Sequence, residues 1–317
     1  MIYRRIYNGI FMPEVRPKFE KTLWEKIKLN KASYVLMAPY LIFFFVFTLL
    51  PIIITFFLSF THFNMLQPPQ WLGWANFERL LLDDDVFLIA VRNTLVFGFI
   101  TGPLSYFICV LFAWFINDLG PKIRTFVTLL FYAPSISGNL FVIWAFIFSG
   151  DTYGLVNGLL MKWGMIREPV QWLNDPKYNL TIIIIVQLWL SLGAGFLAFI
   201  AGLQSVDKSL YEAGSVDGIK NRWQELWYIT LPSMVPQLMF GAVMQIITSF
   251  TLSDVSMSLA GFPSTKYSAH TIPIHIIDYG MVRYEMGYAS ALAVVLLLGM
   301  VILNKVIFAL LRRISND

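Results

Sequence analysis

Charged side chains are scarce in this sequence of 317 residues, where Asp, Glu, Lys and Arg together make up only 13%. A soluble domain usually contains about a quarter of such residues. Hydrophobic residues account for 57% of the chain, and 28 residues are phenylalanine. A soluble core does not need so many apolar side chains, so the composition indicates an integral membrane protein.

Cysteine, histidine and nucleotide-binding signatures are rare or missing. The single cysteine, Cys109, excludes an intrachain disulfide. His270 and His275 do not have the His-Glu-x-x-His spacing, and no cysteine cluster accompanies them, so we expect no metal site. The sequence has neither the glycine-rich phosphate loop of ATPases nor the Gly-x-Ser-x-Gly elbow of hydrolases. We therefore predict no catalytic residue and no cofactor in this chain, and no nucleic-acid partner.

The N-terminal segment 1–34 contains eight Lys or Arg residues and precedes an apolar run over residues 35–60. This run is longer than the core of a signal peptide, and no small-residue cleavage site follows it, so we expect it to remain as a membrane anchor. Phe19, Leu23 and Ile27 form an apolar stripe, which predicts an amphipathic helix within the N-terminal segment.

Six segments have the length needed to cross a bilayer. A hydrocarbon core about 30 Å thick requires about 20 apolar helical residues. The segments lie near residues 35–60, 90–116, 125–148, 180–203, 233–256 and 287–311. They predict an all-α, multi-pass membrane protein with six transmembrane helices.

Basic residues are divided unevenly between the two sides of these spans. The N-terminus, residues 117–124, residues 204–232 and the tail hold 16 Lys or Arg, and the opposite loops hold seven. Because basic loops stay in the cytoplasm, we predict that both termini, including the tail 312–317, and the 204–232 loop are cytoplasmic. Residues 35–311 then form one transmembrane domain. We find no internal repeat, which suggests that a second subunit supplies the other half of any transport pathway.

The loop over residues 204–232 is unusually polar for this chain. Ser209 to Val216 can form a short helix, and Gly218 can end it in a left-handed conformation. A second helix is predicted from Asn221 to Tyr228. On the pattern alone, this helix–turn–helix has two possible roles: docking to a partner, or packing on lipid headgroups.

The same loop resembles the EAA motif of membrane subunits of binding-protein-dependent ABC importers. The family pattern is Glu-Ala-Ala, three residues, Gly, about nine residues and Ile-x-Leu-Pro. The matching residues are Glu212, Ala213, Gly218, Ile229, Leu231 and Pro232. Asp217 and Trp223 match the carbohydrate-uptake branch, the maltose-type permeases. Gly214 departs from the pattern, and ten residues instead of nine follow Gly218, which predicts a later helix start or a bulge.

The resemblance extends over most of the chain. It includes the first-span sequence APYLIFFFVFTLLPI, the segment NFERLLLDDDVFLIAVRNTL, the loop sequence WLNDP and the run YASALAV. It implies a permease subunit in the bacterial cytoplasmic (inner) membrane. The implied partners are a second, homologous permease, two ATPase subunits that bind ATP and Mg²⁺, and an extracytoplasmic solute-binding protein.

The resemblance also implies an ATP-driven importer of sugars. The substrate would be a di- or oligosaccharide, including acidic ones such as alginate or pectin fragments. The first helix of the loop would be the coupling helix that transmits motion of the ATPase. The residues predicted for this coupling are Glu212, Ala213, Asp217, Gly218 and Trp223.

Polar residues within the apolar spans suggest a substrate pathway, because such residues tend to face a bundle interior or a water-filled cavity. The candidates are Asn139, Gln187, Ser191, Gln245 and Ser249, together with Trp144 and Trp189 as stacking surfaces for sugar rings. The alternative is that the polar residues form hydrogen bonds between helices. Two other functions were weighed, an ion-coupled transporter and an intramembrane enzyme. The first lacks ionisable residues at mid-membrane, and the second lacks a convincing catalytic set.

Overall fold

The computed structural model describes residues 28–138 and 140–316, with side chains up to residue 309. Asn139 and nearly all of the predicted N-terminal amphipathic helix therefore lie outside the described residues. The chain divides into two compact units, Met1–Ile54 and Thr55–Asp317.

The first unit contains most of the first span. Helix α2 (Lys31–Phe44) continues through the π-helical segment η1 (Phe45–Leu49) into α3 (Leu50–Leu58), which ends in the second unit. None of the side chains in these three elements is buried. A helix that is apolar all round is suited to contact with lipid or another membrane helix.

The second unit contains the remaining elements of the described chain. In order they are β1 (Thr61–His62), β2 (Gln70–Trp71), α4 (Ala75–Leu82), α5 (Asp85–Asn117), α6 (Pro121–Ile136), α7 (Phe141–Ile147), α8 (Leu155–Lys162), α9 (Asn179–Leu190), α10 (Ala194–Ser205), α11 (Lys208–Val216), α12 (Arg222–Glu225), η2 (Leu226–Thr230), α13 (Leu231–Ser233), α14 (Val235–Phe250), α15 (Asp254–Ala260), η3 (Thr265–Tyr267), α16 (Ile272–Ile277), η4 (Asp278–Val282) and α17 (Met286–Asn316).

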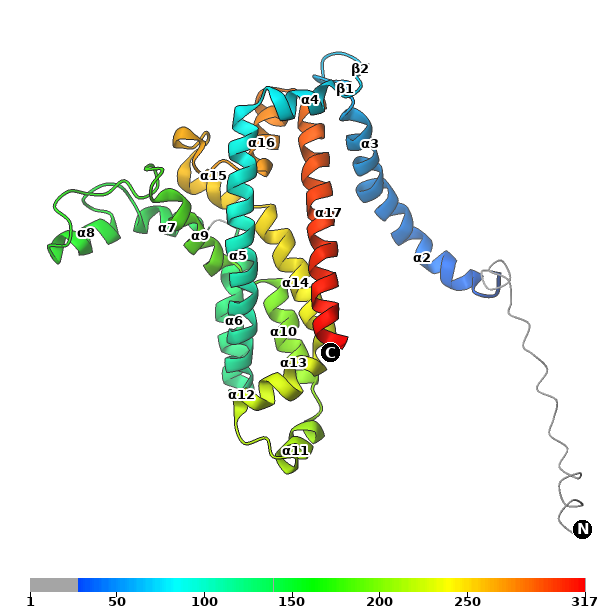
Figure 1. Ribbon diagram of the computed structural model, residues 1–317, viewed down its shortest axis with the longest axis vertical. Coiled ribbons are helices and arrows are strands. Elements are labelled where there is room, and N and C mark those ends of the chain that lie inside the picture. The colour runs from blue at the N-terminus through cyan, green and yellow to red at the C-terminus, as the bar shows by residue number, and fades with distance from the viewer. Residues whose placement is uncertain (1–27, 139, 317) are drawn as a thin grey trace, which may run out of the picture. The chain divides into compact units, whose positions relative to one another are not determined.

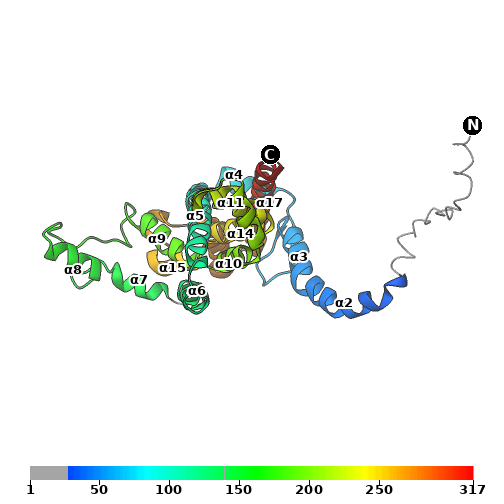
Figure 2. The ribbon, with the colours of Figure 1, turned by 90° about the horizontal axis from the view of Figure 1, so that it is seen from below.

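Three long helices, α5, α10 and α14, pack against one another, and α17 packs against α14. The core between them is apolar and includes Cys109, Ala113, Phe196, Phe199 and Met234. Figure 1 shows α11 at one end of this bundle, with α4 and α16 at the other. Figure 2 views the same bundle along its length.

The end of the bundle near α4 is organised by local hydrogen bonds. Strands β1 and β2 form a short antiparallel hairpin. The side-chain amide of Asn76 in α4 donates to the carbonyl oxygens of Ser59 and Thr61, each at 2.9 Å. Asp84 caps α5, because its carboxylate accepts from the backbone nitrogen of Phe87 at 2.9 Å.

The predicted spans coincide with helices long and apolar enough to cross a membrane. Five such helices are present among the described residues, and α6 and α7, taken together as one bent span, make a sixth. The prediction of an all-α membrane protein with up to six spans is confirmed. Three of the predicted spans are interrupted, however. The breaks lie between α6 and α7, between α9 and α10, and between α14 and α15.

Candidate functional site

The loop between the fourth and fifth spans forms the helix–turn–helix that its sequence predicts. The carboxylate of Asp207 caps α11 by accepting from the backbone nitrogen of Ser209 at 3.0 Å. The helix ends at Val216, and Gly218 follows with a φ of +97°. This backbone conformation favours glycine, because a side chain would be strained there. The chain then turns back toward the bundle.

The second helix of the loop contains the bulge that the extra residue predicts. Asn221 caps α12 by accepting from the backbone nitrogen of Gln224 at 2.9 Å. The five residues of η2 are π-helical. A π-turn adds one residue to an α-helix, which accounts for ten residues instead of nine after Gly218. The hydroxyl of Thr230 donates to the carbonyl oxygen of Glu225 at 3.1 Å, so this carbonyl oxygen has a hydrogen-bond donor within the wider π-turn.

Gly214, the other departure from the family pattern, lies where α11 meets η2. A Cβ atom at this position would be 2.6 Å from Cδ1 of Ile229 and 3.0 Å from Cδ1 of Ile219. The absence of a side chain thus allows α11 to approach η2 closely. The hydroxyls of Tyr211 and Thr230 are 2.9 Å apart across the same contact.

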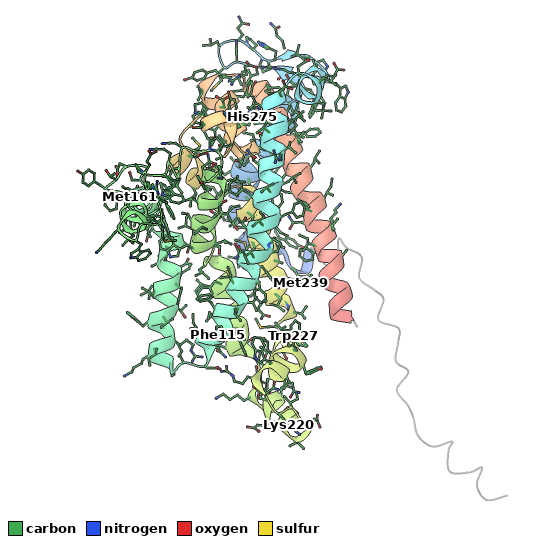
Figure 3. The ribbon with its side chains drawn as sticks, turned by 60° about the vertical axis from the view of Figure 1, so that its left-hand side comes forward. Phe115, Met161, Lys220, Trp227, Met239 and His275 are labelled. Carbon is green, nitrogen blue, oxygen red and sulfur yellow. The ribbon has the colours of Figure 1, made fainter. Side chains whose placement is uncertain are left out.

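The outer surface of α11 is free of intrachain packing. Glu212, Ala213, Asp217 and Gly218 are all exposed. Val216, the last residue of the helix, is 87% exposed. Figure 3 shows Lys220 and Trp227 of this loop at the end of the bundle opposite His275. An exposed apolar and acidic helix is suited to docking on another protein.

Trp223 differs from the other predicted coupling residues because it packs against a span. Its ring centroid lies 4.9 Å from that of Trp114 near the end of α5. Arg222 forms an ion pair with Asp118, the C-terminal cap of α5, and its guanidinium lies 5.0 Å from the centre of the Trp114 ring.

A break in the fourth span lies inside the bundle. Helix α9 ends at Leu190, and Gly193 begins α10 in a non-helical conformation. The side-chain amide of Gln245 in α14 donates to the carbonyl oxygen of Ser191 at 3.2 Å and lies 3.2 Å from the Cys109 sulfur. Backbone groups freed by a break inside a membrane need such partners.

Four of the predicted pathway residues, Gln187, Ser191, Gln245 and Ser249, are buried, and Ser249 is only 2% exposed. Trp144 and Trp189 are half-buried. The rings of Trp144 and Trp189 meet edge to face, with centroids 5.4 Å apart. The arrangement of Gln245 and Ser191 matches the interhelical alternative. A role of these residues in a substrate pathway remains a prediction.

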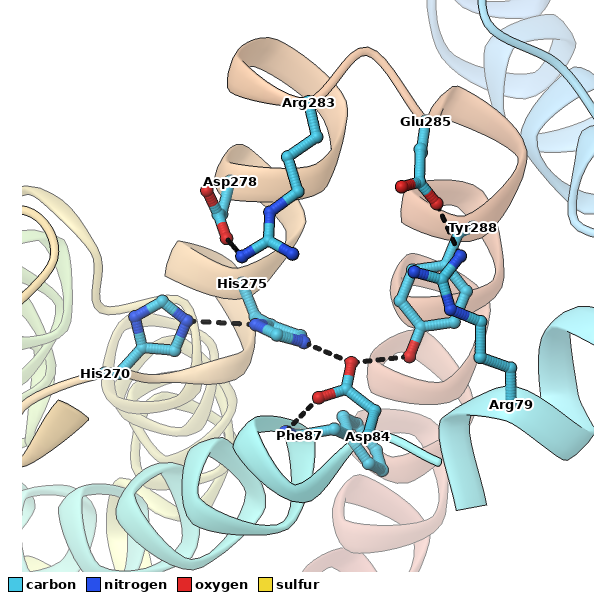
Figure 4. A network of polar contacts seen from close by, with 9 residues as sticks. All are labelled: Arg79, Asp84, Phe87, His270, His275, Asp278, Arg283, Glu285 and Tyr288. Atoms are coloured by element: carbon cyan, nitrogen blue, oxygen red, sulfur yellow. Dashed lines mark hydrogen bonds and ion pairs between the residues drawn. The ribbon is translucent and has the colours of Figure 1, made fainter. Parts of the chain in front are cut away.

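A buried polar network lies at the other end of the bundle (Figure 4). The carboxylate of Asp84 is within 2.9 Å of Nε2 of His275 and accepts from the hydroxyl of Tyr288 at 2.7 Å. Nδ1 of His275 lies 3.0 Å from Nε2 of His270. Since an ionised carboxylate only accepts, His275 donates to Asp84 through Nε2.

The surroundings shift the protonation of this network. Burial opposes ionisation of Asp84, but hydrogen bonds from Tyr288, His275 and the backbone of Phe87 outweigh it and lower the pKa of Asp84. Burial, and next the neighbouring His275, lower the pKa of His270 to about 4. At pH 7, His270 is therefore neutral and Asp84 is ionised.

Two ion pairs cover the network. Arg79 pairs with Glu285 at 2.5 Å, and Arg283 pairs with Asp278 at 2.7 Å. The local spacing of the two histidines gives no indication of this network. The described residues contain no cluster of three or more His, Cys, Asp or Glu side chains able to hold a metal ion. The network instead joins the ends of α5, α16 and α17.

Comparison with known proteins gives consistent matches. Residues 95–316 match the family described as binding-protein-dependent transport system inner membrane component. The probable ABC transporter permease protein YesP of Bacillus subtilis (strain 168) is 31% identical over 283 residues, which are 88% of this chain and 90% of that protein. The arabinooligosaccharides transport system permease protein AraP of the same organism is 29% identical over 289 residues, which are 89% and 90% of the two chains.

The fold has also been seen in a solved structure. A bacterial ABC transporter involved in the import of the acidic polysaccharide alginate contains a chain with 26% sequence identity and a TM-score of 0.73. The match covers 93% of this chain and 100% of that chain.

Proposed function

Because the chain belongs to the inner membrane components of binding-protein-dependent transport systems, the ABC transporter permeases, we propose that it forms half of the translocation pathway of a sugar importer. The observation that carries this proposal is the exposed helix α11, which has the EAA-type residues on a rigid loop between the fourth and fifth spans. The chain itself is proposed to be non-catalytic.

The proposed substrate is an oligosaccharide. Support comes from the arabinooligosaccharide permease and the alginate transporter, which are similar along nearly their whole lengths. Oligosaccharides that contain uronic acids are the first subclass to test, because the alginate transporter handles an acidic polysaccharide. Arg92 lies in α5 and Lys305 in α17, and these two cations are offered as secondary positions for variants.

The proposed assembly contains a second permease, two ATPase subunits and an extracytoplasmic solute-binding protein. Glu212 would make a charge-assisted contact with a basic group of the ATPase, because its carboxylate is exposed on α11. The basic loops support a cytoplasmic position for α11 and for both termini. ATP and Mg²⁺ would be held entirely by the ATPase subunits.

In the proposed cycle, ATP binding closes the ATPase pair and draws the coupling helices together. The spans then change from an inward-facing to an outward-facing arrangement that accepts the sugar. Hydrolysis restores the first arrangement. An ion-coupled transporter is a weaker alternative, because Asp118 and Asp254 lie at helix ends.

Co-purification with measured ATP hydrolysis tests this function. The complete transporter would be solubilised with this chain carrying an affinity tag. We expect ATPase subunits to be retained by the unmodified chain and by Glu168→Lys, which makes the same charge change at an exposed residue of another loop. We expect Glu212→Lys to lose the ATPase or to uncouple its activity from transport. Absence of any ATPase from the unmodified complex would contradict the proposal.

A further inference from the structure

Two contacts join the second helix of the coupling loop to the end of α5. The Arg222 guanidinium forms an ion pair with Asp118 and lies over the ring of Trp114. The neighbouring Trp223 packs against the same ring, with a centroid distance of 4.9 Å. Trp114 is buried, at 8% exposure, so it is a fixed surface for both partners.

Each contact would be weak if it stood alone. The side chains of Arg222 and Asp118 are 53% and 43% exposed, and half-exposed ion pairs contribute little to stability. Here the same guanidinium also stacks on an indole, and a second indole packs beside it. The cation–π contact and the aromatic contact each add to the attraction of the ion pair. Arg222 and Trp223, which are adjacent in one helical turn, thus both bind the end of α5 at Trp114.

Hydrogen bonds stabilise the turn between α5 and α6. The Arg124 guanidinium, near the start of α6, donates to the carbonyl oxygen of Asn117 at 3.3 Å and to its side-chain oxygen at 3.2 Å. The residue that pairs with Arg222, Asp118, directly follows Asn117. A displacement of α12 is therefore transferred to a turn that two helices share.

Open space lies between α11 and this turn. A cavity of about 510 Å³ is lined by Lys208 and Tyr211 of α11, and also by Trp114 and Asn117 of α5. Helix α11 instead contacts η2, through the Tyr211–Thr230 hydroxyl pair and the close approach at Gly214. The cavity separates α11 from α5, so motion of α11 cannot pass to α5 directly. It can pass through η2 and α12, because packed side chains connect α11 to η2 and α12 to α5.

We propose that Arg222 and Trp223 are positioning residues that clamp the coupling loop to Trp114 and Asp118, so that displacement of α11 moves the inner end of the second span. This inference rests on the proposed function and adds a route for its motion. Without the clamp, α11 would still dock on its partner, but its motion would reach only the fourth span, to which it is joined directly after α10, and the fifth span, to which it is joined through η2 and α13.

A spin label on α5 tests the clamp. Phe107 is 62% exposed and lies two turns before Trp114, so Phe107→Cys in a Cys109→Ser chain can carry a nitroxide. The complete transporter would be compared without nucleotide and after trapping with ATP and vanadate. We expect the nitroxide spectrum to change on trapping. The change should fall to less than half in Arg222→Glu and in Asp118→Lys.

Two further variants separate the clamp from general damage. The double variant Arg222→Glu with Asp118→Lys restores an ion pair of opposite polarity and should recover most of the spectral change. Lys220→Glu makes the same charge change two residues earlier in the loop and should leave the spectral change on trapping intact. All variants should retain the ATPase, because α11 is unaltered.

The outcomes distinguish the clamp from the function on which it rests. A trapping-induced change in Arg222→Glu equal to that of the unmodified loop would overturn the clamp, as would a spectrum that never changes in a complex that retains its ATPase. Failure of the double variant to recover would also contradict it. If even the unmodified chain retains no ATPase, the proposed function is wrong.

Discussion

The side-chain amide of Gln245 lies 3.2 Å from the carbonyl oxygen of Ser191, at the break in the fourth span. The donor is on α14, so the fifth span stabilises an irregular segment of the fourth. Gln245 therefore has a structural role in the apolar bundle through this hydrogen bond, in addition to any role in transport.

We predict that Gln245→Leu destabilises the protein, because the Leu side chain fills similar space but donates nothing to Ser191. A lost hydrogen bond of this kind costs about 0.5–1.5 kcal/mol. The midpoint of thermal unfolding in detergent should fall accordingly. Thr251→Val is the control, since Thr251 follows the same helix directly and its hydroxyl donates to the carbonyl oxygen of Ile247 on that helix at 2.7 Å. Equal midpoints for Gln245→Leu and the unmodified chain would show that the contact contributes nothing.

The predicted pathway can be tested by thiol labelling. Single cysteines at Gln187, Ser191, Gln245 and Ser249, in a Cys109→Ser chain, should differ in reactivity toward a water-soluble thiol reagent between nucleotide-free and ATP-trapped transporters. All four side chains are buried in the described arrangement, so we expect low reactivity in one state and higher reactivity in the other. Four positions that never react would be packing contacts, and the pathway would then have to be formed by other faces or by the partner.

A methyl group at position 214 should disturb the coupling loop. Gly214→Ala would place a carbon 2.6 Å from Cδ1 of Ile229, and overpacking of this kind typically costs about 1–3 kcal/mol. We expect a lower thermal midpoint and less ATPase retained in the complex. Ile229→Val removes Cδ1 and should restore at least half of the loss.

The control for this prediction is Gly120→Ala, because no atom lies within 4 Å of a Cβ built at that position. It should behave like the unmodified chain. If Gly214→Ala also has no effect, the close approach of α11 and η2 is not important for docking.

Acid should weaken the network around His270. The pKa of His270 is lowered to about 4 in the folded protein, mainly by burial, from an ordinary value of 6.5. The neutral histidine therefore stabilises the fold above pH 6.5, and this contribution is lost as the pH falls toward 4. The titratable or charged groups that act on His270 are His275, Asp278, Asp84 and Arg283.

Between pH 7.5 and 5.5 the expected loss is about 1 kcal/mol, since one pKa unit corresponds to about 1.4 kcal/mol. The thermal midpoint of the unmodified chain should fall over this range more than that of His270→Gln. His62→Gln, at an exposed histidine of the hairpin, should leave the pH dependence unchanged. Parallel pH profiles for the unmodified chain and His270→Gln would refute the assignment.

The sequence allowed prediction of the spans and the coupling loop because both depend on local patterns. Apolar length located the spans, and the extra residue after Gly218 indicated either a later helix start or a bulge, of which η2 is the bulge. The glycines at 193 and 195 indicate that the fourth span can bend, but the hydrogen bond at this break could not be predicted in this way. Its donor, Gln245, is 54 residues from Ser191 along the chain.

The network around Asp84 was missed for the same reason. His270 and His275 have no informative local spacing, and their carboxylate partner is 191 residues from His275 in the sequence. Trp223 was predicted as a coupling residue from the motif, but its packing on Trp114 depends on how the loop folds back on α5. Contacts between distant segments decide these features, and one sequence alone does not reveal them.

The proposed function depends on docking of α11 to an ATPase at one end of the bundle. Photo-crosslinking from single positions can detect this contact in the intact transporter. A photoreactive amino acid would replace Val216 on α11 or Tyr153 before α8, which are 87% and 88% exposed, respectively. We predict that the probe at position 216 captures an ATPase subunit in the intact transporter and that the probe at position 153 does not. Capture of the ATPase from position 153, or none from position 216, would contradict the account.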